Sequence, residues 1–293
     1  MTRFLTCWIF CLRLSTLFST TLRAGETLHE GEPGTHFAGK GLKVDLVADV
    51  TTIAPGQTFH LALWLRHDPG YHTYWKNPGL AGVPTRLNPT LPEGFKAGEM
   101  IYPPPDKVKM AAINVHGYEH NVLIALPVTA PPVLREGPVT LPVEATWMCC
   151  QRTCNPGHAK MAITLQTGAQ PVPDEKWLPE FKTLQASQPP PATGWKFTAT
   201  RQGKEIALTA NPPDGLPLPP DPQFFSTDNL ICSHPVQNWE KTATGYTVKL
   251  ELSDFLPPDE NHLHAVLSAK GSWLPDQTAP FVTLRIPITP AAP

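Results

Sequence analysis

The chain has 293 residues, a formal net charge of −2 and only 16% charged side chains, and it contains no basic run suited to nucleic acid or to a membrane surface. Its 36 prolines far exceed the usual share of roughly 5%, but a hydrophobic fraction of 41% is too high for a disordered chain. Because proline cannot donate to a strand ladder, it gathers at turns and strand ends. The length and composition therefore predict two all-β domains with proline-rich connections.

The first 24 residues have the pattern of an export signal. Arg3 gives a positive start, Phe4 to Leu12 is mainly apolar, and Leu22-Arg23-Ala24 places the expected cleavage after Ala24. The apolar run is too short to cross roughly 30 Å of hydrocarbon. We therefore expect a soluble mature protein outside the cytoplasm.

A first β-domain is predicted over residues 40–167, after a polar, glycine-rich stretch at 25–39 that predicts a flexible leader. Its strands are indicated by alternating or β-branched apolar residues. The predicted strands are 42–50, 59–66, 121–128, 139–148 and 159–166. Short strands separated by Pro-Gly, Asn-Pro and Pro-Pro-Pro turns are typical of a β-sandwich.

Residues 168–194 interrupt the strand pattern. Trp177, Leu178, Phe181 and Leu184 recur at helical spacing, and the prolines that follow Gln188 end the periodicity. A short helix is therefore predicted here, with an apolar stripe that packs against a domain.

A second β-domain is predicted over residues 195–293. Its predicted strands are 195–200, 205–210, 246–252, 264–269 and 281–288. The fold class predicted for the chain is all-β, with two tandem β-sandwiches joined by a short helical, proline-rich linker.

Three cysteines fall within six residues of the stretch Trp147 to Gly157. A disulfide needs Cα atoms within about 7 Å, whereas residues four apart in an extended strand lie about 13 Å apart. Cys150 and Cys154 can therefore bond only if the chain reverses over Gln151-Arg152-Thr153 and places them opposite each other in a hairpin. A bridge between opposed strand residues is strained and easily reduced, which favours exchange chemistry.

Other arrangements of the cysteines stay open, because four cysteines allow three full connectivities. Cys149 lies on the opposite strand face from Cys150, as a buried free thiol or in a disulfide with Cys232 that would join the two domains. The disulfides could be purely stabilising. Alternatively, Cys149, Cys150, Cys154 and His158 would make a soft site for copper(I) or zinc, and His158 could instead stabilise a thiolate.

With these residues in place, the chain resembles the N-terminal periplasmic region of the DsbD family of thiol:disulfide interchange proteins, especially its ScsB-like branch. The stretches that carry the resemblance are Gly70–Gly79, Leu91–Phe95, His116–Glu119 and Trp147–Gly157. The resemblance implies an immunoglobulin-like sandwich with a redox cysteine pair. It implies that this pair takes electrons from a membrane-embedded partner and passes them to periplasmic oxidoreductases.

The resemblance also implies residue roles. Cys154 matches the cysteine that attacks the substrate disulfide, Cys150 the cysteine that resolves the intermediate, and Pro156 completes a Cys-x-Pro pattern. Tyr102 with Pro103-Pro104-Pro105 lies near the place of a loop that caps the cysteines. Further supporting candidates come from the matching stretches and from a polar–aromatic segment that we expect to form a loop. These candidates are Tyr71, His72, Trp75, Asn77, Tyr118 and Trp147.

The function expected from the sequence is a soluble periplasmic protein-disulfide reductase. It would need no organic cofactor, would act on thioredoxin-like partners, and would receive electrons from a separate membrane protein. The alternatives are a copper- or zinc-binding protein and a structural β-sandwich module with stabilising disulfides only.

Overall fold

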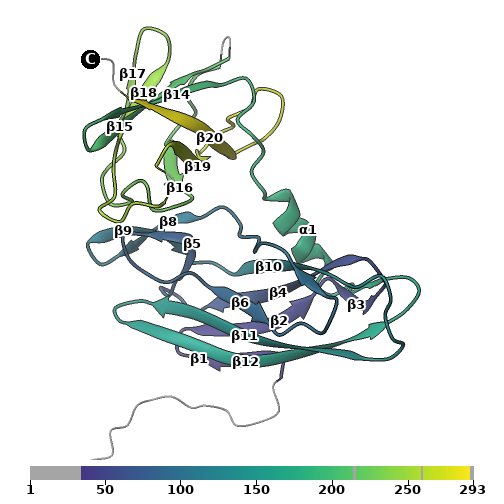
Figure 1. Cartoon of the computed structure of the whole chain (residues 1–293). Helices are drawn as coiled ribbons and strands as arrows, with labels where there is room; N and C mark the ends of the chain where they lie inside the picture. The colour runs from purple at the N-terminus through teal and green to yellow at the C-terminus, as the bar shows by residue number, and fades with distance from the viewer. Residues whose placement is uncertain (1–33, 214–215, 259, 291–293) are drawn as a thin grey trace, which may run out of the picture. The chain divides into compact units, whose positions relative to one another are not determined.

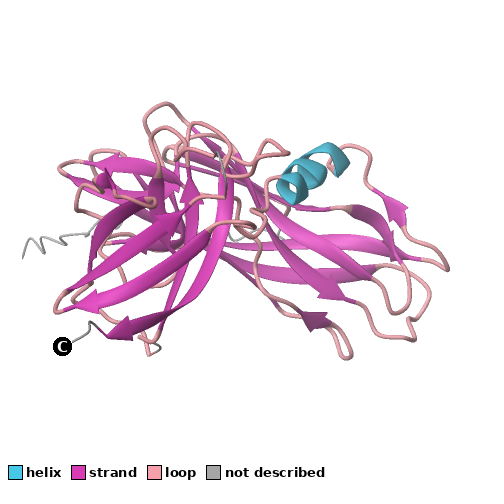
Figure 2. Cartoon of the chain, turned by 90° about the horizontal axis from the view of Figure 1, so that it is seen from above, coloured by secondary structure: helices cyan, strands magenta, loops and turns pink. Residues whose placement is uncertain are grey.

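The structure is a computed structural model that describes residues 34–213, 216–258 and 260–290. The predicted export signal lies outside these residues. The described part consists of strands and turns with one helix (Figure 2), so the all-β prediction is confirmed. None of its helices is both long and apolar enough to span a membrane.

Two five-stranded sheets enclose the larger hydrophobic core (Figure 1). The first contains, in spatial order, β1 (His36–Gly39), β2 (Leu42–Ala48), β4 (Thr58–His67), β10 (Val122–Thr129) and β7 (Lys96–Ala97). The second contains β13 (Val172–Pro173), β3 (Val50–Ile53), β12 (Cys154–Thr167), β11 (Val139–Cys150) and β6 (Arg86–Pro89). Alternate residues of each sheet point into the shared core, as in an immunoglobulin-like β-sandwich.

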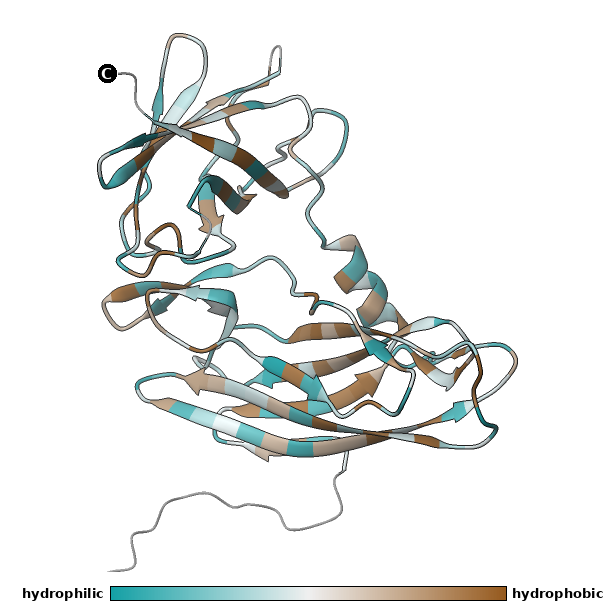
Figure 3. Cartoon of the chain, in the orientation of Figure 1, coloured by the Kyte–Doolittle hydropathy of each residue, from teal (hydrophilic) through white to brown (hydrophobic). Residues whose placement is uncertain are grey.

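The period of two is clearest on β11, where Leu141, Val143 and Ala145 are buried and the residues between them are not. On β4 and β10 the apolar character is more continuous (Figure 3), because their second face is also covered. There the helix α1 (Leu178–Ala186) places Phe181 and Leu184 against the sheet. The predicted helix and its packing against a domain are therefore confirmed.

A three-stranded sheet contains β5 (Thr73–Gly79), β9 (Ile113–Tyr118) and β8 (Asp106–Met110), in that order. It corrects the expectation of a polar–aromatic loop, because the segment from Thr73 onward forms β5 and pairs with β9. An added Cβ on Gly117 of β9 would lie 2.2 Å from the backbone oxygen of Thr73. Glycine at this position therefore permits the close approach of β5 and β9.

A seven-stranded sheet forms most of the C-terminal part of the chain and has a hydrophobic core of its own. Its strands, in spatial order, are β16 (Gln223–Ser226), β19 (His262–Ser268), β20 (Phe281–Pro290), β14 (Lys196–Gln202), β15 (Glu205–Asn211), β18 (Tyr246–Glu251) and β17 (Trp239–Lys241). All five strands predicted for this region are present, and β16 and β17 are additional.

One predicted boundary is corrected by the structure, and a second boundary is not tested by it. The leader was expected to extend to residue 39, but His36–Gly39 pair with β2 as strand β1. All described residues fall in one compact unit, so the division into tandem domains at residues 168–194 stays a prediction.

Candidate functional site

Cys150 and Cys154 face each other at the tip of the β11–β12 hairpin. The two strands pair from Val139 opposite Leu165 to Cys150 opposite Cys154, and the two cysteines form a disulfide across Cα atoms 4.1 Å apart. The chain reverses over the three residues between them, where the Gln151 N–H donates to the Thr153 oxygen at 3.2 Å. The predicted cross-strand bridge is therefore present.

Strands β11 and β12 can stay paired up to the tip of the hairpin because a glycine on one strand faces a bulky side chain on the other. Trp147 lies opposite Gly157 in the register, and an added Cβ on Gly157 would lie 2.1 Å from the indole nitrogen of Trp147. The indole occupies this space and contacts the Phe37 ring edge-on at 5.1 Å. Trp147 is thus a core residue that stabilises the hairpin.

The two bonded cysteines differ in exposure. Cys150 is fully buried, with 0% of its surface exposed, whereas Cys154 is exposed. A second protein can therefore reach the bridge only from the Cys154 side.

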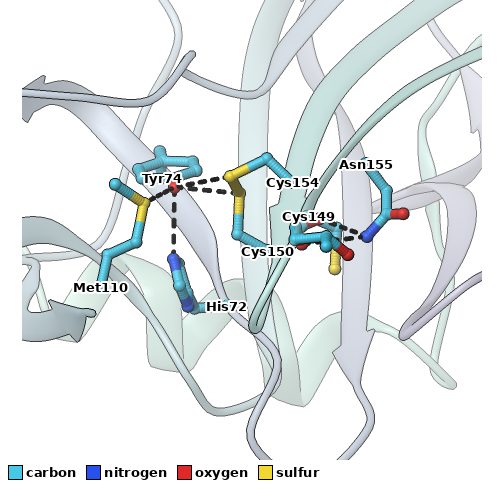
Figure 4. The surroundings of a disulfide bond; sticks show 8 residues. His72, Tyr74, Met110, Cys149, Cys150, Cys154 and Asn155 are labelled. Atoms are coloured by element: carbon cyan, nitrogen blue, oxygen red, sulfur yellow. Dashed lines mark hydrogen bonds between the residues drawn. A yellow bond between two sulfur atoms is a disulfide. The ribbon is translucent and has the colours of Figure 1, made fainter.

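The hydroxyl group of Tyr74 lies at the centre of the disulfide's surroundings (Figure 4). Its oxygen is 3.1 Å from Cys150 Sγ and 3.9 Å from Cys154 Sγ. It is also 3.0 Å from Met110 Sδ and 3.3 Å from His72 Nε2. Burial, with a smaller contribution from Cys149, raises the pKa of Tyr74 to about 12, so the hydroxyl keeps its proton at neutral pH and can donate it to a sulfur atom.

His72 joins the hairpin to the three-stranded sheet through the backbone. Its N–H donates to the Cys150 oxygen at 2.9 Å, and the Cys150 N–H donates to the His72 oxygen at 3.0 Å. Burial lowers the pKa of the His72 ring, so a neutral imidazole stands beside the Tyr74 hydroxyl. Tyr74 follows two residues later and therefore lies on the same side of the strand.

Cys149 takes no part in this group. Its sulfur points away from the disulfide (Figure 4) into the sandwich core, and burial raises its pKa to about 12. Cys149 and Cys232 are both free thiols, so the predicted alternative disulfide between them is wrong. The reason is position, since Cys149 packs inside the sandwich while Cys232 hydrogen-bonds the Glu251 oxygen at the end of β18.

The predicted metal ligands are not brought together. Cys149 is turned into the core, and His158 is exposed on β12, opposite Thr146 in the hairpin register. Among the described residues, no three or more His, Cys, Asp or Glu side chains gather in a group that could hold a metal ion.

Tyr102, which the resemblance placed near a capping loop, and the supporting candidate Tyr118 both direct their hydroxyls at backbone oxygens. Tyr102 is buried in the sandwich core, and its hydroxyl donates to the Thr85 oxygen at 2.6 Å. The Tyr118 hydroxyl donates to the Pro103 oxygen at 2.7 Å. The side chains gathered at the disulfide are those of His72, Tyr74 and Met110.

The remaining predicted residues are dispersed. Trp75 is a core residue, Tyr71 is half-buried with its ring against Gly41, and Pro156 is exposed opposite Met148. Asn77 is buried and turned toward the seven-stranded sheet.

Sequence reasoning did not single out Tyr74 or Met110. Tyr74 lies in the matching stretch Gly70–Gly79, two residues after His72, and this spacing was a usable signal. Met110 carried none, because its approach to the sulfurs depends on the pairing of β8 with β9.

Two comparisons with known proteins bear on this site. Residues 41–166 match the family model described as "Thiol:disulfide interchange protein DsbD, N-terminal". The crystal structure of the N-terminal periplasmic domain of ScsB from Proteus mirabilis superposes with a TM-score of 0.65 at 15% identity, covering 87% of this chain and 97% of that one. At that identity the likeness concerns the fold.

A weaker structural match is the GAE domain of yeast GGA1, with a TM-score of 0.27 at 10% identity over 44% of this chain and 95% of that one. No curated protein sequence matches the chain. The matched family region begins next to β2, ends in β12 and contains the tip of the hairpin with both cysteines. Residues 41–166 therefore match the N-terminal DsbD family of thiol:disulfide interchange proteins, and this matched region contains the disulfide-forming pair Cys150 and Cys154.

Proposed function

We propose that the chain is an exported periplasmic protein that reduces disulfides of thioredoxin-like partners through Cys150 and Cys154. The observation that carries the proposal is the unequal exposure of the two cysteines, with Cys154 exposed and Cys150 fully buried. A cysteine that attacks another protein must be reachable from outside. A cysteine that resolves the intermediate needs to reach only its neighbour.

The exchange proceeds in two substitutions at sulfur. The Cys154 thiolate attacks one sulfur of the partner disulfide, a mixed disulfide forms, and the other partner sulfur leaves as a thiolate that takes up a proton. Cys150 then gives up its proton, its thiolate attacks Cys154 Sγ, and the second partner sulfur leaves as a thiolate that takes up a proton in turn. The Cys150–Cys154 bond has formed, the partner bond has broken, and two electrons have passed to the partner.

Tyr74 supports this chemistry electrostatically. Its hydroxyl is within hydrogen-bonding distance of both sulfurs, and hydrogen bonds to a charged acceptor are about twice as strong as those between neutral groups. The donor therefore favours the thiolate over the thiol. Because the two thiols of Cys150 and Cys154 carry both electrons, no organic cofactor is required. A separate membrane protein would restore the reduced form.

The test is trapping with Cys150→Ala in the native periplasm. This variant keeps the exposed cysteine but cannot resolve an intermediate, so thioredoxin-like partners should accumulate as dithiothreitol-sensitive adducts on Cys154. Cys154→Ala and Cys149→Ala are the matched controls and should give none. The absence of adducts with Cys150→Ala, together with a wild-type bridge that resists dithiothreitol, would support a stabilising disulfide instead.

A further inference from the structure

A buried polar junction connects the three-stranded sheet beside the disulfide to the seven-stranded sheet. It is formed by Asn77 and His116 on one side and by Phe225, Ser226 and Ser233 on the other. We propose that Asn77 and Ser233 are positioning residues for the exchange reaction, because this junction holds Tyr74 and Met110 against the sulfurs. The inference rests on the proposed function and gives the C-terminal part of the chain a role in it.

The side chain of Asn77 ties β5 to the backbone next to β16. Its amide nitrogen donates to the Ser226 oxygen at 2.9 Å and to the Asp228 oxygen, and its side-chain oxygen accepts from the Gly79 N–H at 3.1 Å. Both amide hydrogens are therefore used on the backbone of the seven-stranded part. Asn77 lies three residues after Tyr74 on the same strand, so its anchoring constrains the position of the Tyr74 hydroxyl.

Ser233 fixes the end of β5 and the start of β9 together. Its hydroxyl accepts from the Leu80 N–H at 2.9 Å and donates to the Asn114 oxygen at 3.1 Å. Asn114 pairs with Lys109, the residue before Met110 on β8. An added Cβ on Gly79 would lie 2.2 Å from Ser233 Oγ, so glycine there lets the hydroxyl approach the strand.

His116 fills the space between these two anchors. Its Nδ1 lies 3.1 Å from the Asn77 backbone oxygen, and because a carbonyl can only accept, this nitrogen carries the proton. The ring contacts Phe225 edge-on at 5.0 Å and Trp75 at 6.1 Å. Phe225 packs with the sandwich core although it belongs to β16.

Most of the buried polar side chains lie at this junction or beside the hairpin. Seven such side chains are buried in the described part of the chain, namely His72, Thr73, Asn77, Thr85, His116, Ser226 and Ser233. Four of them belong to the junction, and His72 and Thr73 adjoin the hairpin. The four junction side chains each have a hydrogen-bond partner. Buried polar groups that are all partnered specify one arrangement, since any displacement leaves one of them unpaired. The junction therefore fixes the register of the sheet that carries Tyr74 and Met110.

The test uses the full chain in its reduced form and measures the pH profile of iodoacetamide alkylation at Cys154 by mass spectrometry, together with the melting temperature. Asn77→Ala and Ser233→Ala should each raise the pH midpoint of alkylation by about one unit, the effect of losing one hydrogen bond to a thiolate. Asn211→Ala is the matched control, because Asn211 accepts from Thr244 at 3.3 Å within the seven-stranded part. It should leave the profile unchanged.

A double-variant cycle separates positioning from general support. If Asn77 acts through Tyr74, Asn77→Ala should add no further shift to a Tyr74→Phe protein. An unchanged profile in both junction variants with a lowered melting temperature would overturn the proposal and leave a structural junction only. Ser233→Ala removes a single oxygen atom, so it carries the test alone if Asn77→Ala does not fold. Alkylation needs no partner protein, so its result is independent of whether trapping finds one.

Discussion

The Tyr74 hydroxyl lies 3.1 Å from Cys150 Sγ and is close enough to donate its proton to that sulfur. Met110 Sδ, at 3.0 Å, competes for the same proton. In the disulfide both acceptors are weak. After reduction a thiolate outcompetes the thioether, because a charged acceptor makes the stronger hydrogen bond. The contact therefore favours the reduced form of the protein over the oxidised one.

Removal of this donor tests its role directly. Tyr74→Phe should raise the pH midpoint of Cys154 alkylation by about one unit and slow disulfide exchange at neutral pH about tenfold, since one hydrogen bond to a charged sulfur is lost. The equilibrium with glutathione should shift toward the disulfide, to a potential about 30 mV more negative.

Tyr102→Phe is the control for that substitution. It removes the same atom from another buried tyrosine, whose hydroxyl is bonded to the Thr85 oxygen and to Met100 Sδ instead of to a cysteine sulfur. It should lower stability without moving the alkylation profile. Equal shifts in the two variants would show that the effect of Tyr74→Phe is not specific to the disulfide.

Cys149 should prove dispensable for exchange. Its thiol is buried and its pKa is raised to about 12 by that burial, so in the folded reduced protein it should resist alkylation while Cys154 reacts. Cys149→Ala should leave the exchange rate unchanged and cost about 1 kcal/mol of unfolding free energy, because one core atom is removed. Urea denaturation and the exchange assay measure the two quantities, and a loss of exchange would assign Cys149 a role in the chemistry.

Local and long-range features were unequally predictable from the sequence. The Cys150–Cys154 bridge follows from distances within five residues, and the helix from the spacing of Phe181 and Leu184. The approach of Tyr74 to the sulfurs does not, since the β5–β9 register shifts between Tyr74 and Gly79 and no pattern in the sequence marks that shift. The wrong Cys149–Cys232 pairing has the same origin, because it depended on a long-range arrangement.

Stability should fall in mild acid because of His116. Burial lowers the pKa of this ring from 6.5 to about 4, so below pH 6.5 the unfolded chain takes up a proton that the folded protein refuses. Above pH 6.5 the His116 ring is neutral in both states and costs no stability. As the pH falls from 6.5 to 4, the free energy of unfolding decreases by about 3 kcal/mol because of this ring. Urea denaturation between pH 7 and pH 4 measures the slope.

His116→Gln should flatten that slope without removing it. His67 also has a pKa lowered to about 4, chiefly by burial, so it contributes in the same direction. An NMR titration in which the His116 ring of the folded protein charges near pH 6.5 would contradict the explanation.

Gly117→Ala tests whether β5 must lie close to β9 for the disulfide to be shielded. The added Cβ would meet the Thr73 backbone oxygen at 2.2 Å, and backbone cannot rotate away as a side chain can, so the two strands must separate. We expect a loss of about 1–3 kcal/mol of unfolding free energy. In the reduced protein, Cys150 should become reactive toward iodoacetamide, because Tyr74 moves with β5. Gly34→Ala is the control, since an added Cβ there meets no atom within 4 Å. Protection of Cys150 in a destabilised Gly117→Ala protein would mean that β5 is not what shields this sulfur.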